Sequence, residues 1–168
     1  MTTQNKKYQI IYADPPWQYN FSKSDSRQIE NQYPTMAVED IKKLVIPSDV
    51  NSVLYLWATA PKLLEALEVM KAWGFTYKTH AIWDKEIIGM GYWFRGQHEL
   101  LLVGVKGKLS PPEQSLRVAS VIKVHRTTHS SKPRIVMDLI ESWYPTQTKI
   151  EIFSRCKRLG WDSWGNEI

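Results

Sequence analysis

The sequence predicts an open α/β sheet flanked by helices. Short runs of apolar and β-branched residues alternate with helical patterns along the chain, as in βαβ units. No internal repeat, low-complexity tract or obvious linker divides the 168 residues. We therefore expect a single domain over 1–168. In such a sheet, ligands bind beyond the carboxyl ends of the strands.

Six segments have the composition of strands. The first, 8–13, is β-branched and aromatic and stops at two prolines, which cannot continue a ladder. The second, 52–58, is apolar enough to be buried on both faces. The others are predicted over 79–83, 99–105, 118–124 and 148–153. Because helical segments separate several strands, we expect parallel pairing with right-handed crossovers.

Three segments have the composition of helices, over 38–44, 62–73 and 131–142. The second carries leucines on one side and stops at Gly74, and the third has Pro133 in its first turn. The polar stretch 18–33 and the Gly-rich, aromatic stretch 88–96 are expected to be loops. Long loops in compact domains usually have a function.

Composition excludes several classes of protein. The chain is 43% hydrophobic with a net charge of +5, which excludes general disorder. No stretch approaches the roughly 18 apolar residues of a membrane span, and the polar N-terminus does not look like a signal peptide. We therefore expect a cytoplasmic protein without a membrane partner. The lone Cys156 excludes an internal disulfide, and we expect no metal site. The modest basicity permits a nucleic-acid partner without requiring one.

The sharpest motif, Asp14-Pro15-Pro16-Trp17, directly follows the first strand. Asp-Pro is also a common way to open a turn, and the tryptophan could simply cover the core. The position of this motif at the carboxyl end of a predicted strand favours a catalytic role instead. Two prolines fix the backbone and remove two N–H donors, so the Pro15 carbonyl is expected to be free to accept. With the Asp14 carboxylate it would form a rigid pair of acceptors beside the flat face of Trp17.

Such a pair suits an aromatic amine. The exocyclic amino group of adenine offers two N–H donors, but its nitrogen lone pair is delocalised into the ring. Acceptors on both N–H groups would localise that lone pair and stabilise the positive charge that appears as a new bond forms. Attack on a methyl sulfonium then needs position more than a strong base. We expect Asp14 to be the catalytic residue, with Pro15, Pro16 and Trp17 completing the catalytic motif.

Further motifs follow along the chain: Tyr33-Pro-Thr-Met36, Leu56-Trp-Ala-Thr59, Trp73-Gly-Phe75, Gly104-Val-Lys-Gly107, His129 with Lys132-Pro133, Lys149 to Arg155, and Trp164-Gly-Asn-Glu167. Together with the first motif, this ordered series resembles the MT-A-seventy-like family of S-adenosylmethionine-dependent adenine-N6 methyltransferases over nearly the whole chain. The resemblance implies a Rossmann-like methyltransferase sheet of permuted order, with the catalytic strand first and the cofactor strand last. That order accounts for the absence of a strand-borne G-x-G-x-x-G motif.

The resemblance also implies binding residues. The cofactor S-adenosylmethionine would contact Asp14, Lys106, Arg155, Asn166 and Glu167. A carboxylate or amide suits the ribose hydroxyls, and a lysine suits the methionyl carboxylate. On the substrate side, the expected residues are Tyr33 and Trp17 as stacking surfaces and Arg95 as a nucleic-acid contact. Where several relatives carry His-Asn, this chain has Lys157 and Arg158, which leaves their partner, phosphate or solvent, open.

The resemblance implies methylation of the N6 amino group of adenine in nucleic acid. DNA is favoured over RNA, because the compact chain resembles phage and prophage DNA enzymes. Three alternatives stay open: an RNA adenine methyltransferase, a cytosine-amino methyltransferase, and a non-catalytic nucleic-acid-binding subunit. The intact first motif favours an enzyme over the last of these. A homodimer is also compatible with the sequence. Readout of the target sequence would fall to loops 18–32, 84–96 and 106–117.

Overall fold

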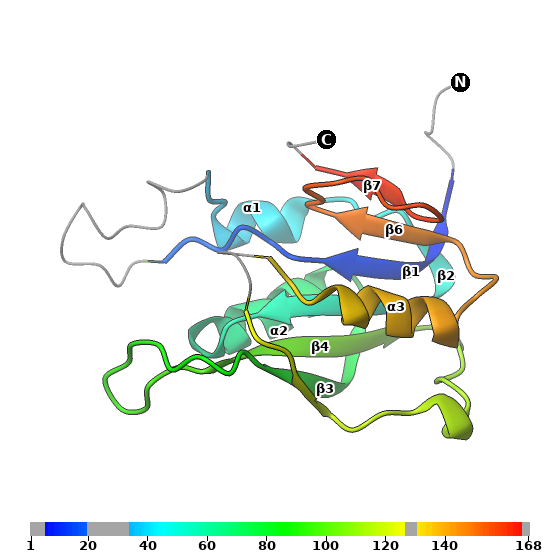
Figure 1. The fold of residues 1–168 in the computed structure, drawn as a ribbon. Coiled ribbons are helices and arrows are strands. Elements are labelled where there is room, and N and C mark those ends of the chain that lie inside the picture. The colour runs from blue at the N-terminus through cyan, green and yellow to red at the C-terminus, as the bar shows by residue number, and fades with distance from the viewer. Residues whose placement is uncertain (1–5, 20–33, 127–130, 166–168) are drawn as a thin grey trace.

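The computed structural model describes residues 6–19, 34–126 and 131–165, whose strands form one seven-stranded sheet. The strand order is β5-β3-β4-β2-β1-β6-β7 (Figure 1). The strands are β1 (Tyr8–Ala13), β2 (Ser48–Ala58), β3 (Thr76–Asp84), β4 (His98–Lys106), β5 (Val121–Lys123), β6 (Lys149–Ile152) and β7 (Asp162–Trp164). The predicted α/β class is confirmed.

Strand β4 runs antiparallel to both of its neighbours, β2 and β3, whereas the other neighbouring pairs are parallel. The prediction of parallel pairing is therefore wrong at β4. The reason is its connection: loop 85–97 joins β3 to β4 without a crossover helix, so the chain returns in the opposite direction. The start of β4 thus lies at the edge where β1 and β2 end, and its last residue, Lys106, lies at the opposite edge.

Helices cover both faces of the sheet (Figure 1). The short α1 (Val38–Lys43) and α2 (Leu63–Ala72) pack on one face, and α3 (Arg134–Trp143) packs on the other. Alternate residues of β2 serve the two cores: Leu54 and Leu56 face α1 and α2, whereas Tyr55 and Trp57 face α3. Short 3-10 turns, η3 (Ala60–Lys62) and η4 (Gln114–Leu116), occur in the connections.

The observed elements differ from the predicted ones mainly at their ends. Strand β2 begins at Ser48, four residues before the apolar run, and β5 is limited to three residues. Helix α3 begins after Pro133, which is its N-cap residue rather than part of its first turn. Strand β7 was not predicted, because three residues at a sheet edge show no apolar pattern. No helix in the described part of the chain is long and apolar enough to cross a membrane.

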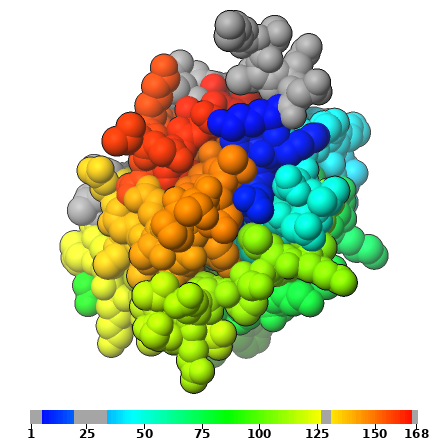
Figure 2. Space-filling view, turned by 90° about the vertical axis from the view of Figure 1, so that its right-hand side faces the viewer, coloured from blue at the N-terminus to red at the C-terminus, as the bar shows by residue number. Residues whose placement is uncertain are grey.

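The first strand lies in the middle of the sheet, between β2 and β6. This is the permuted order that the sequence predicted, with the strand that carries the Asp-Pro-Pro-Trp motif first and β6 near the end of the chain. The carboxyl ends of β1, β2 and β6 therefore meet at one edge, which we call the catalytic edge. Figure 2 shows the opposite edge, where the yellow-green segment after β4 protrudes.

We predict that Gly104→Ala destabilises the fold by about 1–3 kcal/mol, because it overpacks the core. A Cβ at Gly104 would lie 3.0 Å from the Cβ of Phe75 and 2.7 Å from the sulfur of Met70, which is fully buried. Denaturant unfolding measures the change in free energy, and far-UV circular dichroism controls for a native fold. Wild-type stability would contradict the close approach of Met70 and Phe75 to Gly104.

Candidate active site

Asp14 immediately follows β1 at the catalytic edge, and its side chain is 18% exposed. The Lys132 ammonium lies 2.9 Å from its Oδ1. Burial raises the pKa of Asp14, because a carboxylate loses solvation in the protein interior. Lys132 partly offsets this effect, as does the more distant Arg155, while Glu99 adds to it. The result is a net raised pKa for a carboxyl group held in place by one lysine.

Lys132 stands between two carboxylates. Its Nζ contacts Oε2 of Glu99 at 3.2 Å as well as Asp14, and Oε1 of Glu99 lies 3.4 Å from Nζ of Lys85. Burial alone would favour the neutral amine of Lys132. The attraction and hydrogen bonds of Asp14 and Glu99 outweigh burial and hold its pKa above the ordinary value. The site is therefore a line of alternating charges from Asp14 to Lys85.

Two of these residues, Lys132 and Glu99, were not among the predicted site residues. Lys132 belongs to one of the family motifs, in the segment before α3, and Glu99 belongs to the apolar run predicted as a strand over 99–105. Glu99 is the second residue of β4. It lies at the catalytic edge only because β4 is antiparallel to β2, so the direction of this strand is the information that was needed to find it. Sequence composition does not give that direction.

The sequence analysis predicts a free Pro15 carbonyl, but in the structure this carbonyl is already engaged. It accepts a hydrogen bond from the backbone N–H of Trp17 at 2.9 Å, closing a tight turn around Pro16. The Pro16 carbonyl in turn accepts the N–H of Met36 at 2.8 Å. A carbonyl oxygen has two lone pairs, so Pro15 keeps one acceptor position beyond this turn. The turn fixes the direction in which that position points.

Trp17 is a core residue. Its side chain is 4% exposed, it packs among the buried residues on the α1–α2 face, and its indole N–H donates to the Trp57 carbonyl at 3.1 Å. The prediction that Trp17 offers a flat face to a base is therefore wrong for this structure. The alternative that the tryptophan covers the core is correct. Its role is to anchor the turn that follows Asp14.

Buried aromatic residues support the site from below. The indole of Trp57 donates to the Tyr12 hydroxyl at 2.6 Å and makes edge-to-face contacts with Tyr12 and Trp83. The Lys132 ammonium lies 5.7 Å from the centre of the Trp57 ring, within cation–π range. These rings come from β1, β2 and β3, and β4 lies between the last two in the sheet; the cluster fixes the Trp57 ring against which Lys132 packs.

A cavity of about 870 Å³ opens beside Asp14, between β1, β6 and α3. Its lining includes Glu151 of β6, whose carboxylate accepts a hydrogen bond from the Ser154 hydroxyl at 2.9 Å. Burial raises the pKa of Glu151. Arg155 lines the same cavity and lies close enough to Asp14 to lower its pKa. The structure thus brings the predicted Asp14 and Arg155 together, and adds Glu151.

Lys106 lies away from this cavity. It is the last residue of β4, at the edge opposite to Asp14, and its ammonium donates to the Ser48 hydroxyl at 3.0 Å. The prediction that it binds the methionyl carboxylate is wrong. The physical reason is again the antiparallel direction of β4, which carries its carboxyl end away from the catalytic edge. The cation that the structure places beside Asp14 is that of Lys132.

The remaining predicted residues divide into two groups. Tyr33, Asn166 and Glu167 lie outside the described residues. Arg95 is exposed on loop 85–97, which starts and ends at the catalytic edge, and its Nε donates to the Gly89 carbonyl at 3.0 Å. Arg158, for which phosphate or solvent was left open, instead pairs with Asp138 and Glu141 of α3.

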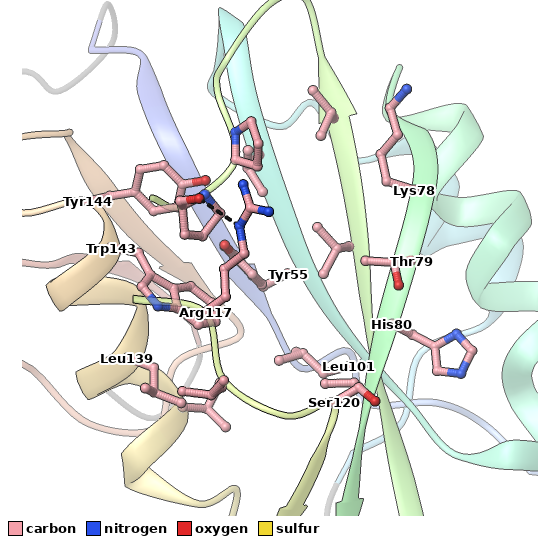
Figure 3. A pocket seen from close by; sticks show the side chains of 18 of the residues that line it. Tyr55, Lys78, Thr79, His80, Leu101, Arg117, Ser120, Leu139, Trp143 and Tyr144 are labelled. Atoms are coloured by element: carbon pink, nitrogen blue, oxygen red, sulfur yellow. Dashed lines mark hydrogen bonds between the residues drawn. The ribbon is translucent and has the colours of Figure 1, made fainter. Parts of the chain in front are cut away.

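A second cavity, of about 680 Å³, lies on the α3 face of the sheet (Figure 3). Its walls come from β2, β3, β4, α3 and the segment after β4, with Tyr55, Leu101, Leu139 and Trp143 among the side chains that Figure 3 labels. The described residues that line it include no carboxylate. The sequence motif after β1 does not border it, whereas the cavity beside Asp14 combines that motif with carboxylates and cations, so the cavity beside Asp14 is the candidate active site.

The sequence model of the MT-A70 family matches residues 8–167. The chain belongs to the MT-A70 family. It is 37% identical to the type II methyltransferase M.MunI of Mycoplasma sp, over 97% of this chain and 78% of that protein. Human METTL3, an N(6)-adenosine-methyltransferase catalytic subunit, is 30% identical over 96% of this chain and 28% of its own length. Human METTL4, an N(6)-adenine-specific methyltransferase, is 26% identical over 97% of this chain and 38% of its own length. The predicted family and the predicted class, an adenine-N6 methyltransferase, are confirmed.

We predict that Lys132→Met raises the pKa of Asp14 further, because the buried carboxylate loses its nearest positive charge. Titration of the carboxyl carbon of Asp14 by NMR measures the change. Lys85→Met is the matched control, since Lys85 pairs with Glu99 and is not paired with Asp14; it should leave the titration of Asp14 nearly unchanged. An unaltered pKa in the Lys132 variant would contradict the charge arrangement described here.

Proposed function

We propose that this chain transfers a methyl group from S-adenosylmethionine to the N6 amino group of adenine in DNA. The observation that carries the proposal is the position of Asp14. It is a largely buried carboxylate at the end of the central strand, held by Lys132, and it borders a large cavity whose lining includes several charged side chains. This arrangement provides an acceptor for an amine beside space for a cofactor.

The cavity beside Asp14 fits S-adenosylmethionine. Its volume lies within the range of small-molecule sites, about 300–1,000 Å³. Glu151 is a half-buried carboxylate on its wall, with acceptor capacity for the two ribose hydroxyls beyond the hydrogen bond from Ser154. Lys132 and Arg155 bring positive charge for a carboxylate such as the methionyl one. Asn166 and Glu167 remain part of the proposal as further contacts at the ribose.

Asp14 acts on the amine in this proposal. Its carboxylate and the remaining lone pair of the Pro15 carbonyl accept the two N–H groups of adenine N6, which localises the nitrogen lone pair. S-adenosylmethionine supplies the methyl group as an electrophilic carbon on a sulfonium. Asp14 stabilises the positive charge that develops on N6 and accepts the proton that the methylated nitrogen releases. Lys132 is a positioning residue, because it keeps Asp14 ionised and oriented.

DNA is the favoured substrate. The similarity to M.MunI, a type II methyltransferase, extends over 78% of that protein, whereas the similarity to METTL3 covers 28% of that protein. Arg95 on loop 85–97 is the proposed backbone contact, and Tyr33 the proposed stacking surface for the base. The homodimer expected from the sequence stays a prediction.

We predict that Asp14→Asn lowers methyl transfer by about 10²–10³-fold or more, because the variant loses the charge that stabilises the transition state. Tritium transfer from labelled S-adenosylmethionine to matched DNA and RNA gives the rate, and mass spectrometry of the nucleosides identifies the product. Asp49→Asn, at the opposite edge of the sheet, is the matched control. Full activity of the Asp14 variant, or a product other than N6-methyladenine, would refute the proposal, and faster transfer to RNA would correct the substrate.

We predict that Glu151→Gln weakens S-adenosylmethionine binding about tenfold or more, because hydrogen bonds to a charged acceptor contribute roughly 1.5–3 kcal/mol. Lys106→Ala should leave the affinity unchanged, because Lys106 lies at the other edge of the sheet. Isothermal titration calorimetry with S-adenosylmethionine measures both variants. Unchanged affinity of Glu151→Gln together with weaker binding by Lys106→Ala would show that the cofactor does not bind in the cavity beside Asp14.

A further inference from the structure

Loop 85–97, the green loop between β3 and β4 in Figure 1, projects from the catalytic edge. It carries large apolar side chains that are almost fully exposed to solvent. Tyr92, Trp93 and Phe94 are 101%, 95% and 91% exposed, and Met90 is 88% exposed. Exposed apolar patches of this kind mark binding surfaces, because leaving them in water is unfavourable. We call the consecutive residues Tyr92, Trp93 and Phe94 the aromatic tip.

The loop holds the aromatic tip in a defined turn. Gly89 and Gly96 are joined by a hydrogen bond from N–H to carbonyl at 2.7 Å, and the Gly96 N–H donates to the Met90 carbonyl at 3.1 Å. Inside the turn, a Cβ at Gly91 would lie 1.9 Å from the Phe94 carbonyl oxygen, so only glycine fits there. The side chain of Arg95 closes the turn by donating to the Gly89 carbonyl. A turn closed in this way keeps the three rings directed outward.

The base of the loop is connected to the catalytic carboxylate. The Lys85 N–H donates to the Gln97 carbonyl at 2.9 Å, which closes the loop where β3 ends and β4 begins. The Lys85 side chain pairs with Glu99, which reaches Asp14 through Lys132. A ligand that fills the site beside Asp14 and extends along this edge therefore meets the aromatic tip.

The charge near the aromatic tip favours a nucleic acid as that ligand. Loop 85–97 carries one carboxylate, Glu86 at its base, against Lys85 and Arg95, and the part from 87 onward contains no aspartate or glutamate. The segment that follows β5 lies along the base of the loop, where the Arg126 N–H donates to the Lys85 carbonyl at 3.2 Å, and it starts beside Lys123. Flat rings next to cationic side chains suit stacked bases next to phosphates.

We propose that the aromatic tip is a wedge that stacks on the bases flanking the target adenine and keeps that adenine out of the duplex. The inference rests on the proposed function, in which adenine of DNA is the substrate. An adenine inside a duplex cannot bring its amino group to Asp14 without leaving the base stack. Apolar side chains that insert between base steps are a known way of holding a duplex open.

The test compares paired and unpaired target adenines. Trp93→Ser and the triple variant Tyr92→Ser/Trp93→Ser/Phe94→Ser remove the rings without touching the core, because all three side chains are exposed. We expect kcat/KM of the triple variant on a fully paired duplex to fall about tenfold or more relative to wild type, because stacking of the bases on the three rings is lost. On the same duplex with the target adenine opposite an abasic site, activity should stay within about threefold of wild type, because no stacked pair has to be opened.

Val50→Ser is the matched control for loss of an exposed apolar side chain. Val50 is 74% exposed in β2, near the start of the strand and far from the catalytic edge. This variant should methylate both duplexes at the wild-type rate. Melting temperatures of all variants check that the fold is retained.

Two outcomes would overturn the wedge: tip variants that methylate the paired duplex as fast as wild type, or an equal loss on both duplexes. A wild-type dimer that the triple variant converts to a monomer in analytical ultracentrifugation would assign the aromatic tip to a second copy of the chain instead. A wild-type protein that forms no N6-methyladenine on either duplex would refute the proposed function. In that case a duplex with 2-aminopurine at the target position tests the wedge separately, because the fluorescence of this base rises when it leaves the stack. The fluorescence should rise when wild type binds and should not rise with the tip variants; an equal rise with both would contradict the wedge.

Discussion

The contact between Asp14 and Lys132 is the interaction on which the site depends. A carboxylate at the end of a central strand is removed from water by the strands on either side, and burial favours its neutral form. A neutral acid would donate a hydrogen bond where an acceptor is needed. The ammonium of Lys132, positioned by Glu99 and by the ring of Trp57, offsets part of that effect. The surrounding aromatic core fixes this cation.

The direction of one strand decides which residues reach this contact. Because β4 is antiparallel, its first residues rather than its last lie beside Asp14. Glu99 is thereby brought into the site and Lys106 is carried away from it. The same reversal places loop 85–97 at the catalytic edge, where a crossover helix would otherwise stand. One change in connection therefore sets both the charge pattern of the site and the shape of the surface around it.

The sequence predicted the elements well, because strong local signals marked them: the run before Asp14, the apolar segment that becomes β2, and the helix that stops at Gly74. The family resemblance named Asp14 and Arg155 as cofactor contacts, and both residues line the same cavity. Prediction from the sequence failed where the answer depended on long-range geometry. The antiparallel pairing of β4 misplaced Lys106, and the depth of the core beneath the prolines turned Trp17 from a binding surface into an anchor. Local composition carries neither strand direction nor burial depth.

The place of β1 between β2 and β6 has a consequence for how the chain is made. One neighbour of β1 follows soon after it in the sequence, but the other is separated from it by almost the whole length of the domain. During synthesis, one edge of the strand that carries Asp14 stays unpaired until β6 leaves the ribosome. An open apolar edge in a nascent chain invites misassociation, and pairing of such distant segments is slow. The permuted order thus makes completion of the catalytic edge wait for the synthesis of β6.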